Sequence, residues 1–145
     1  MRRSDTGWKA DLPGVVRKAT LRVRYAETDA MGWVYYATYL CYFEVGRTEL
    51  IRAVWKPYRE IERDGLILPV VEAGCRYYRS VFYDDELEIE SRMTFPSEVR
   101  VRFDYRIRRA GEEELLAEGH TVHCFVGRDS KVVRVPRELR DAVAR

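Results

Sequence analysis

The stretch ATYLCYFEVGRTELIRAVW, residues 37–55, decides the fold that this sequence predicts. Apolar or small residues recur along it at the spacing of one helix face, namely Tyr39, Phe43, Gly46, Leu50 and Val54, with Leu40, Arg47 and Ile51 alongside them. The pattern predicts an amphipathic helix of roughly 27 Å. Pro57 stops it, because proline cannot continue a helix.

Segments of alternating or β-branched residues surround this helix and predict strands. Residues 20–25 form the first predicted strand, and residues 26–34 form a loop. Beyond the helix come a short helical or irregular connection over residues 58–65 and the predicted strands 68–80, 86–93, 99–108, 114–126 and 132–135. A helical turn is predicted from Pro136. This order is an α+β pattern, in which one curved antiparallel sheet of about five strands wraps around one long central helix.

Length and composition indicate one domain. Of the 145 residues, 46% are hydrophobic and 34% charged, which describes a compact soluble protein rather than a disordered or fibrous one. We expect residues 1–14 to form a tail and residues 15–145 the domain. A net charge of +2 is too small to indicate a nucleic-acid partner. The N-terminus has no signal-peptide pattern and no window approaches ~20 apolar residues, so we expect a cytoplasmic protein without a membrane span.

Several kinds of catalytic site need residues that this sequence lacks. It has neither a Gly-x-Ser-x-Gly elbow for a nucleophilic serine nor a glycine-rich phosphate loop. His120 and His123 are its only histidines, and three positions apart on a strand they point to opposite faces, so no metal site is expected. The cysteines are odd in number and widely spaced, which favours small core residues over disulfides; they are Cys41, Cys75 and Cys124.

The remaining candidate is the loop before the helix, where Asp29 precedes the first helical turn. The first turn of a helix has N–H groups without intrahelical partners. These groups and the helix dipole can stabilise an oxyanion, while a nearby carboxylate can attack a carbonyl or deprotonate water. From the residues alone, Asp29 can equally be the centre of an Asx-turn or a helix cap, and these readings stay open.

Six segments of the chain are similar to one known family. They are ETDAMG (residues 27–32), YYATYL (35–40), FEVGR (43–47), PVVEA (69–73), YDDELEI (83–89) and AEGHT (117–121). Together with the order of the predicted elements, they resemble the 4-hydroxybenzoyl-CoA thioesterase family, which includes the acyl-CoA thioesterases associated with the Tol-Pal system. The resemblance covers nearly the whole chain.

This resemblance implies a hotdog fold and homodimers or homotetramers with active sites at the dimer interface. It implies an acyl-CoA thioester as substrate, with no cofactor apart from the coenzyme A of that substrate. Asp29 matches the family's catalytic aspartate, and the backbone N–H of Tyr36 matches the group that binds the thioester carbonyl. The residues implied in substrate binding are Gly32, Val34, Tyr35 and Tyr39.

At two positions this chain has a different residue from the one common in parts of that family. The Tol-Pal-associated branch usually has histidine where this chain has Tyr36, and both branches commonly have asparagine where it has Thr38. Tyrosine at position 36 is similar to the 4-hydroxybenzoyl-CoA enzymes themselves. The acyl group therefore stays open between aliphatic and aromatic.

Other residues could take part, and a structural role is the first expectation for each. Glu44, a second carboxylate, is expected to pair with Arg47 or with a strand. Aromatic residues that could line an acyl pocket, although they are first of all core, are Tyr25, Tyr35, Tyr39, Tyr77 and Tyr78. Basic residues that could contact coenzyme A phosphates, although solvated surface is the default, are Arg76, Arg79, Arg128 and Lys131.

Two other functions stay open. A hotdog dehydratase or hydratase would need an acid and a histidine together in the site, and both histidines lie far along the chain from Asp29. A non-catalytic acyl-CoA-binding module could retain Asp29 as well. The prediction that the sequence favours is a thioester hydrolase in which Asp29 is the nucleophile or general base.

Overall fold

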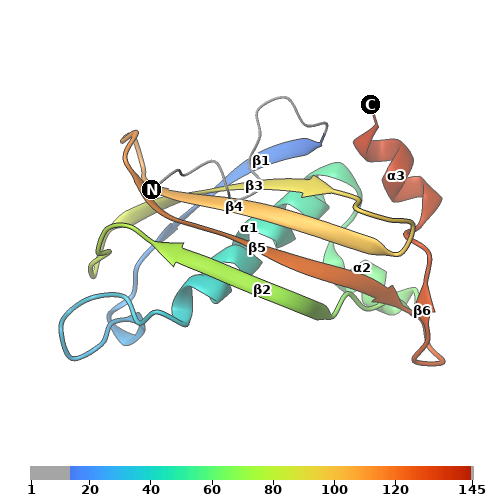
Figure 1. The fold of residues 1–145 in the computed structure, drawn as a ribbon, viewed down its shortest axis with the longest axis horizontal. Coiled ribbons are helices and arrows are strands. Elements are labelled where there is room, and N and C mark those ends of the chain that lie inside the picture. Colours follow the sequence, from blue (N-terminus) through green and yellow to red (C-terminus); the bar gives the residue numbers. More distant parts are fainter. Residues whose placement is uncertain (1–13, 145) are drawn as a thin grey trace.

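The computed structural model describes residues 14–144, whose path is drawn in Figure 1. The first elements are strand β1 (Val15–Arg22), the 3-10 helix η2 (Tyr25–Glu27), the long helix α1 (Thr38–Val54) and helix α2 (Tyr58–Arg63). The strands that follow are β2 (Val70–Tyr77), β3 (Glu86–Thr94), β4 (Arg100–Arg109), β5 (Leu115–Val126) and β6 (Val132–Val133). Helix α3 (Arg137–Val143) comes last. The predicted α+β order is confirmed.

The strands form one antiparallel sheet that curves around α1. Its order is β1-β3-β4-β5-β2, with the short β6 paired to β5. Helix α1 lies across one face, behind the sheet in the view of Figure 1. Strands β1 and β2 are therefore the two edges of the main sheet, and β2 ends beside the start of α1 (lower left of Figure 1).

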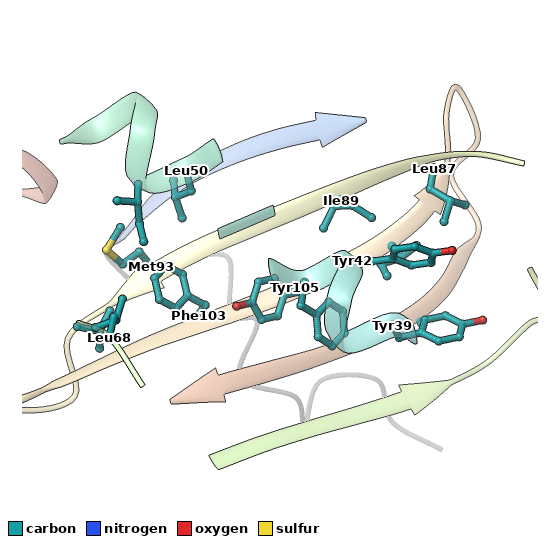
Figure 2. Close-up of a cluster of buried hydrophobic side chains, with 14 of the residues drawn as sticks. Tyr39, Tyr42, Leu50, Leu68, Leu87, Ile89, Met93, Phe103 and Tyr105 are labelled. Atoms are coloured by element: carbon teal, nitrogen blue, oxygen red, sulfur yellow. The ribbon is translucent and has the colours of Figure 1, made fainter. Parts of the chain in front are cut away.

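The core lies between α1 and the sheet. The buried residues of the helix are Tyr39, Tyr42, Phe43, Gly46, Leu50 and Ile51, and Figure 2 shows part of this cluster against Ile89, Met93 and Phe103. Gly46 lets the helix approach the sheet closely, because a Cβ there would come within 2.8 Å of the Ile89 side chain. The buried face differs slightly from the predicted one, since Tyr42 is buried while Leu40 is exposed.

The first strand is the element that the sequence pattern misplaced. It was expected at residues 20–25, whereas β1 runs from Val15, opposite Met93, to Arg22, opposite Glu86. Its first five residues, VVRKA, do not alternate between apolar and polar side chains. A strand at the edge of a sheet does not need apolar side chains on both of its faces. Of the expected tail, residues 1–13 lie outside the described residues.

The face of the sheet that points away from α1 is charged. The acids of β3 pair with basic residues of both neighbouring strands, and the carboxylate of Glu90 lies 3.2 Å from Arg108 of β4. Glu86 and Glu88 instead pair across to β1, with Arg22 at 3.0 Å and Lys18 at 3.5 Å. Such pairs at a solvated surface stabilise a fold only modestly.

The cysteine prediction holds for two of three residues. All three are free; Cys124 is buried and Cys75 is partly buried. Cys41 is exposed, because it lies on the side of α1 that does not face the sheet. Separately, none of the helices within residues 14–144 is long and apolar enough to cross a membrane.

Candidate active site

The loop between β1 and α1 is folded by its own backbone hydrogen bonds. The N–H of Asp29 donates to the carbonyl of Trp33 at 2.7 Å, and the N–H of Gly32 donates to the carbonyl of Asp29 at 3.0 Å. Gly32 has a φ of +80°, and a Cβ there would meet nothing within 4 Å. The turn therefore accounts for this glycine, because residues with side chains rarely adopt such a φ.

Asp29 has one carboxylate oxygen engaged in this turn. Its Oδ1 accepts the N–H of Met31 at 2.9 Å and the N–H of Trp33 at 3.2 Å. This is the Asx-turn that the sequence left open, whereas the cap position of α1 is taken by Ala37. Within residues 14–144 no group donates to Oδ2. The turn thus fixes the carboxylate and leaves its second oxygen available for chemistry.

Glu27 anchors the loop to its surroundings. Its Oε1 accepts the Arg24 N–H at 2.9 Å and the Tyr42 hydroxyl at 3.0 Å, and its Oε2 lies 3.2 Å from Nε of Arg24. Burial acts to raise the pKa of Glu27, but the hydrogen bonds from Arg24 and Tyr42 outweigh it and lower that pKa. The carboxylate is therefore ionised at neutral pH and holds the start of the loop against α1.

The turn that enters α1 contains amides without a hydrogen-bond partner among the described residues, and the amide of Tyr36 is one of them. The N–H of Tyr35 donates to the carbonyl of Glu27, and the N–H of Thr38 donates to the carbonyl of Tyr35, each at 2.9 Å. For the N–H of Tyr36, the described part of the chain offers no acceptor. Because the positive end of the helix dipole lies at this turn, the amide is suited to an oxyanion.

A cavity of about 310 Å³ connects these groups. Its lining residues are Asp29, Met31, Trp33, Val34, Tyr36, Tyr39, Tyr77, Tyr78, Arg79 and Ser80. They come from the loop, the first turn of α1 and the end of β2, which meet at the lower left of Figure 1. A carboxylate, a helix-start amide and a mainly aromatic wall therefore face one space.

Four of the six predicted site residues line this cavity, namely Asp29, Val34, Tyr36 and Tyr39. Gly32 and Tyr35 flank it without lining it, and the Tyr35 ring lies 4.6 Å from the Tyr36 ring. Sequence reasoning missed Met31, Trp33 and Ser80. Met31 and Trp33 carried a usable signal, since large apolar residues in a polar loop indicate a binding surface. Ser80 carried none.

The other candidates lie elsewhere. Glu44 is exposed, and within residues 14–144 it forms no ion pair, so the expected pairing with Arg47 or with a strand is wrong. As predicted, the histidines face opposite ways: His120 is bonded to Glu72 on the outer face, and His123 is buried. Of the basic residues, Arg79 lines the cavity, whereas Arg128 and Lys131 follow the far end of β5.

The described residues offer no set of ligands for a metal ion. No three side chains of histidine, cysteine, aspartate or glutamate within residues 14–144 are grouped so that they could hold a metal ion. The groups that the cavity itself offers are one carboxylate, backbone amides, hydroxyls and the guanidinium of Arg79.

Comparison with known proteins shows that the chain is similar to thioesterases. Residues 23–143 match the thioesterase-like superfamily. A candidate acyl-CoA thioesterase of Bacillus subtilis is 34% identical over 116 residues, which cover 79% of this chain and 83% of the relative. The structure of a DHNA-CoA thioesterase from Staphylococcus aureus is 28% identical and has a TM-score of 0.83, covering 89% of each chain.

A more distant structure shares the fold. It is a mutant 4-hydroxybenzoyl-CoA thioesterase in complex with 4-hydroxybenzoyl-CoA, 16% identical, with a TM-score of 0.80 over 88% of this chain and 98% of that one. The hotdog fold and the family resemblance expected from the sequence are thereby confirmed. The chain belongs to the thioesterase-like superfamily and is a thioester hydrolase.

Proposed function

We propose that this hydrolase cleaves acyl-CoA thioesters in the cavity beside Asp29, with Asp29 as nucleophile or general base and the N–H of Tyr36 as oxyanion donor. One observation carries the proposal. A carboxylate oxygen and a helix-start amide, neither with a hydrogen-bond partner in residues 14–144, border the same cavity. Coenzyme A as the carrier is supported by the names of the relatives.

Two routes are open to Asp29. As a general base, it takes a proton from a water molecule whose oxygen attacks the carbonyl carbon. As a nucleophile, its own oxygen attacks and forms a mixed anhydride, which water then hydrolyses. In both, the negative charge on the carbonyl oxygen is stabilised by the Tyr36 N–H and the N-terminus of α1. The C–S bond breaks, and the thiolate leaves without a strong general acid because it is a good leaving group.

The acyl group is proposed to bind against Val34 and Tyr39, with Gly32 and Tyr35 at the margin of the cavity. Tyr39 is 4% exposed, and burial raises its pKa to about 12. Its phenol therefore stays protonated at neutral pH. No described group hydrogen-bonds this hydroxyl, and Figure 2 shows it pointing out of the same end of the core as that of Tyr42. It is available to a polar atom of the acyl group.

We also propose that the active form is a homodimer or homotetramer. Strand β2 is an edge strand, and its side chains Val70, Val71 and Tyr77 are about half exposed. An open edge with apolar side chains is suited to pairing with a second copy of the chain. Sedimentation at micromolar concentration should give a dimer or tetramer, and a strictly monomeric protein would contradict an interfacial site.

The compartment and the need for cofactors follow as proposals. Three free cysteines fit a reducing compartment, which supports the cytoplasm. The reaction above uses the cavity's own groups and water, so we propose that it needs neither a metal nor a cofactor beyond the coenzyme A of the substrate.

A thiol-release screen tests the function. Short, branched, long and aromatic acyl-CoAs would each be tested as substrates. We expect at least one of them to release free thiol at a rate proportional to the enzyme concentration. Hydration of an enoyl-CoA without thiol release would favour a hydratase instead, although neither histidine lines the cavity. Tight acyl-CoA binding without thiol release from any substrate would favour a binding module.

A further inference from the structure

The turn that presents the N–H of Tyr36 is held by few contacts. Ala37 caps α1 without a side-chain hydrogen bond, and the first helical turn has no acidic residue. Backbone hydrogen bonds fix the flanking amides, from Tyr35 to Glu27 and from Thr38 to Tyr35. These bonds hold the two ends of the turn but not the peptide group that follows Tyr36.

Tyr77 supplies a contact to that peptide group from a distant part of the chain. Its hydroxyl donates to the carbonyl oxygen of Tyr36 at 2.8 Å, across 41 positions of sequence. Burial and the neighbouring Cys75 raise the pKa of Tyr77, so the phenol is protonated at neutral pH and can act as the donor.

Tyr77 is itself held on two sides. Its backbone pairs with Ala117 of β5, at the end of β2. Its ring packs edge-on against Tyr39, with centroids 4.8 Å apart and planes at 85°. Tyr39 is part of the buried cluster in Figure 2. The position of the Tyr77 hydroxyl is therefore set by the sheet and by the core of α1.

We infer that Tyr77 is a positioning residue for thioester hydrolysis: by binding the carbonyl of Tyr36, it orients the N–H of Tyr36 toward the cavity. This inference rests on the proposed oxyanion role of that N–H. The N–H belongs to the peptide group before the Cα of Tyr36, and the N–H of Thr38 holds that group through the Tyr35 carbonyl, while the Tyr77 hydroxyl holds the peptide group after the same Cα. Because each peptide group is planar, fixing both of them limits the two backbone rotations at Tyr36 that would turn its N–H away. Loss of one neutral hydrogen bond of this kind corresponds to roughly a three- to tenfold decrease in kcat.

The kinetic test compares two tyrosines that each bond a backbone group. Tyr77→Phe removes only the hydroxyl, and we expect kcat for benzoyl-CoA or hexanoyl-CoA to fall about three- to tenfold, with KM within about twofold. Tyr58→Phe is the control, because the Tyr58 hydroxyl accepts the N–H of Leu68 at 3.0 Å and does not line the cavity. That variant should keep both constants.

A spectroscopic test separates positioning from a general loss of stability. Benzoyl-CoA and hexanoyl-CoA with ¹³C-labelled carbonyls would be bound to the Asp29→Asn variant, in which the thioester persists. We expect the carbonyl stretching band to lie lower than in water, and to return part of the way when Tyr77→Phe is added. The same band position in both variants, with unchanged circular dichroism, would overturn the role of Tyr77.

The two proposals fail in different ways. If the unmodified protein releases no thiol and binds neither probe, the proposed function is contradicted. If it hydrolyses thioesters while Tyr77→Phe changes neither kcat nor the carbonyl band, the proposed function stands and the positioning role is contradicted.

Discussion

The hydroxyl of Tyr42 donates a 3.0 Å hydrogen bond to Oε1 of Glu27 and so joins the buried face of α1 to the loop that carries Asp29. Tyr42 is fully buried, and the Glu27 side chain is 16% exposed. The bond therefore lies mostly out of solvent, where a hydrogen bond to an ionised group contributes more than a neutral one. The loop is thus coupled to the core two residues before the candidate catalytic carboxylate.

Tyr42→Phe is expected to lower the free energy of unfolding by about 1–2 kcal/mol at pH 7. The pKa of Glu27 is lowered in the folded state, so its contribution is present above the unfolded value of 4.5 and is lost as pH falls through the folded pKa. The difference between Tyr42→Phe and the parent should accordingly shrink in acid. Urea denaturation at pH 7 and near pH 3 measures this difference in the free energy of unfolding. An equal difference at both pH values would show that the hydrogen bond does not depend on the ionised Glu27.

His123 should make stability depend on pH in a second window. Burial lowers its pKa to about 4 from 6.5, although its hydrogen bond to the Leu68 carbonyl opposes this. Between these values the unfolded chain binds a proton that the folded chain does not. Stability is therefore complete above pH 6.5 and falls by up to roughly 3 kcal/mol as pH drops to 4.

The His123→Gln variant tests this contribution. The ring lies between the Leu68 carbonyl at 3.0 Å and the Thr121 hydroxyl at 2.8 Å, so the substitution also costs stability at every pH. The informative quantity is the slope of unfolding free energy between pH 4 and 6.5, which should be shallower in the variant. Equal slopes in the variant and the parent would show that His123 has the same protonation in the folded and unfolded states.

The elements that the sequence predicted well have strong local patterns. Helix α1 was predicted at residues 37–55 and found at 38–54, because its apolar period continues over several turns. Strand β4 was predicted from strict alternation, which follows from one buried and one charged face. β1 lacks such a pattern over its first five residues, and its position is fixed by pairing with β3 and by packing of Val15 and Leu21 against the core.

Only the part of the candidate site that lies in the loop and at the start of α1 could be predicted from the sequence. Asp29 and Tyr36 lie within eight positions of each other, and a family resemblance pointed to both. Ser80 and the Tyr77 hydroxyl reach the same place only because β2 ends beside the start of α1. Contacts between segments some forty residues apart depend on the sheet order, which propensity and periodicity do not determine.

Asp29→Asn is expected to lower kcat by at least ~10²-fold with little change in substrate affinity, since the shape is kept and the charge is removed. Asp129→Asn is a matched control. Asp129 also accepts an N–H two residues on, from Lys131 at 3.2 Å, but it lies outside the cavity, after the far end of β5. Thiol release by both variants on the same acyl-CoA measures the difference, and unchanged turnover in Asp29→Asn would refute the mechanism.

The last prediction separates the backbone of Tyr36 from its side chain. Removing a true oxyanion donor costs ~10²–10³ in kcat, whereas Tyr36→Phe keeps the amide and should leave kcat within about tenfold. The Tyr36 side chain is 62% exposed, so the substitution should also leave the core intact. Tyr36→His likewise keeps the amide, and we expect it to retain activity while its preference among acyl groups shifts with the shape and polarity of the pocket.

The measurement is kcat and KM for both Tyr36 variants over the acyl-CoA panel, with circular dichroism to confirm folding. A loss confined to some acyl groups would mark the side chain as a specificity contact, because an oxyanion donor acts on every thioester alike. If Tyr36→Phe were as damaging as Asp29→Asn on every thioester while remaining folded, the phenol itself would take part in the reaction. The assignment of the oxyanion site to the amide at the start of α1 would then be wrong.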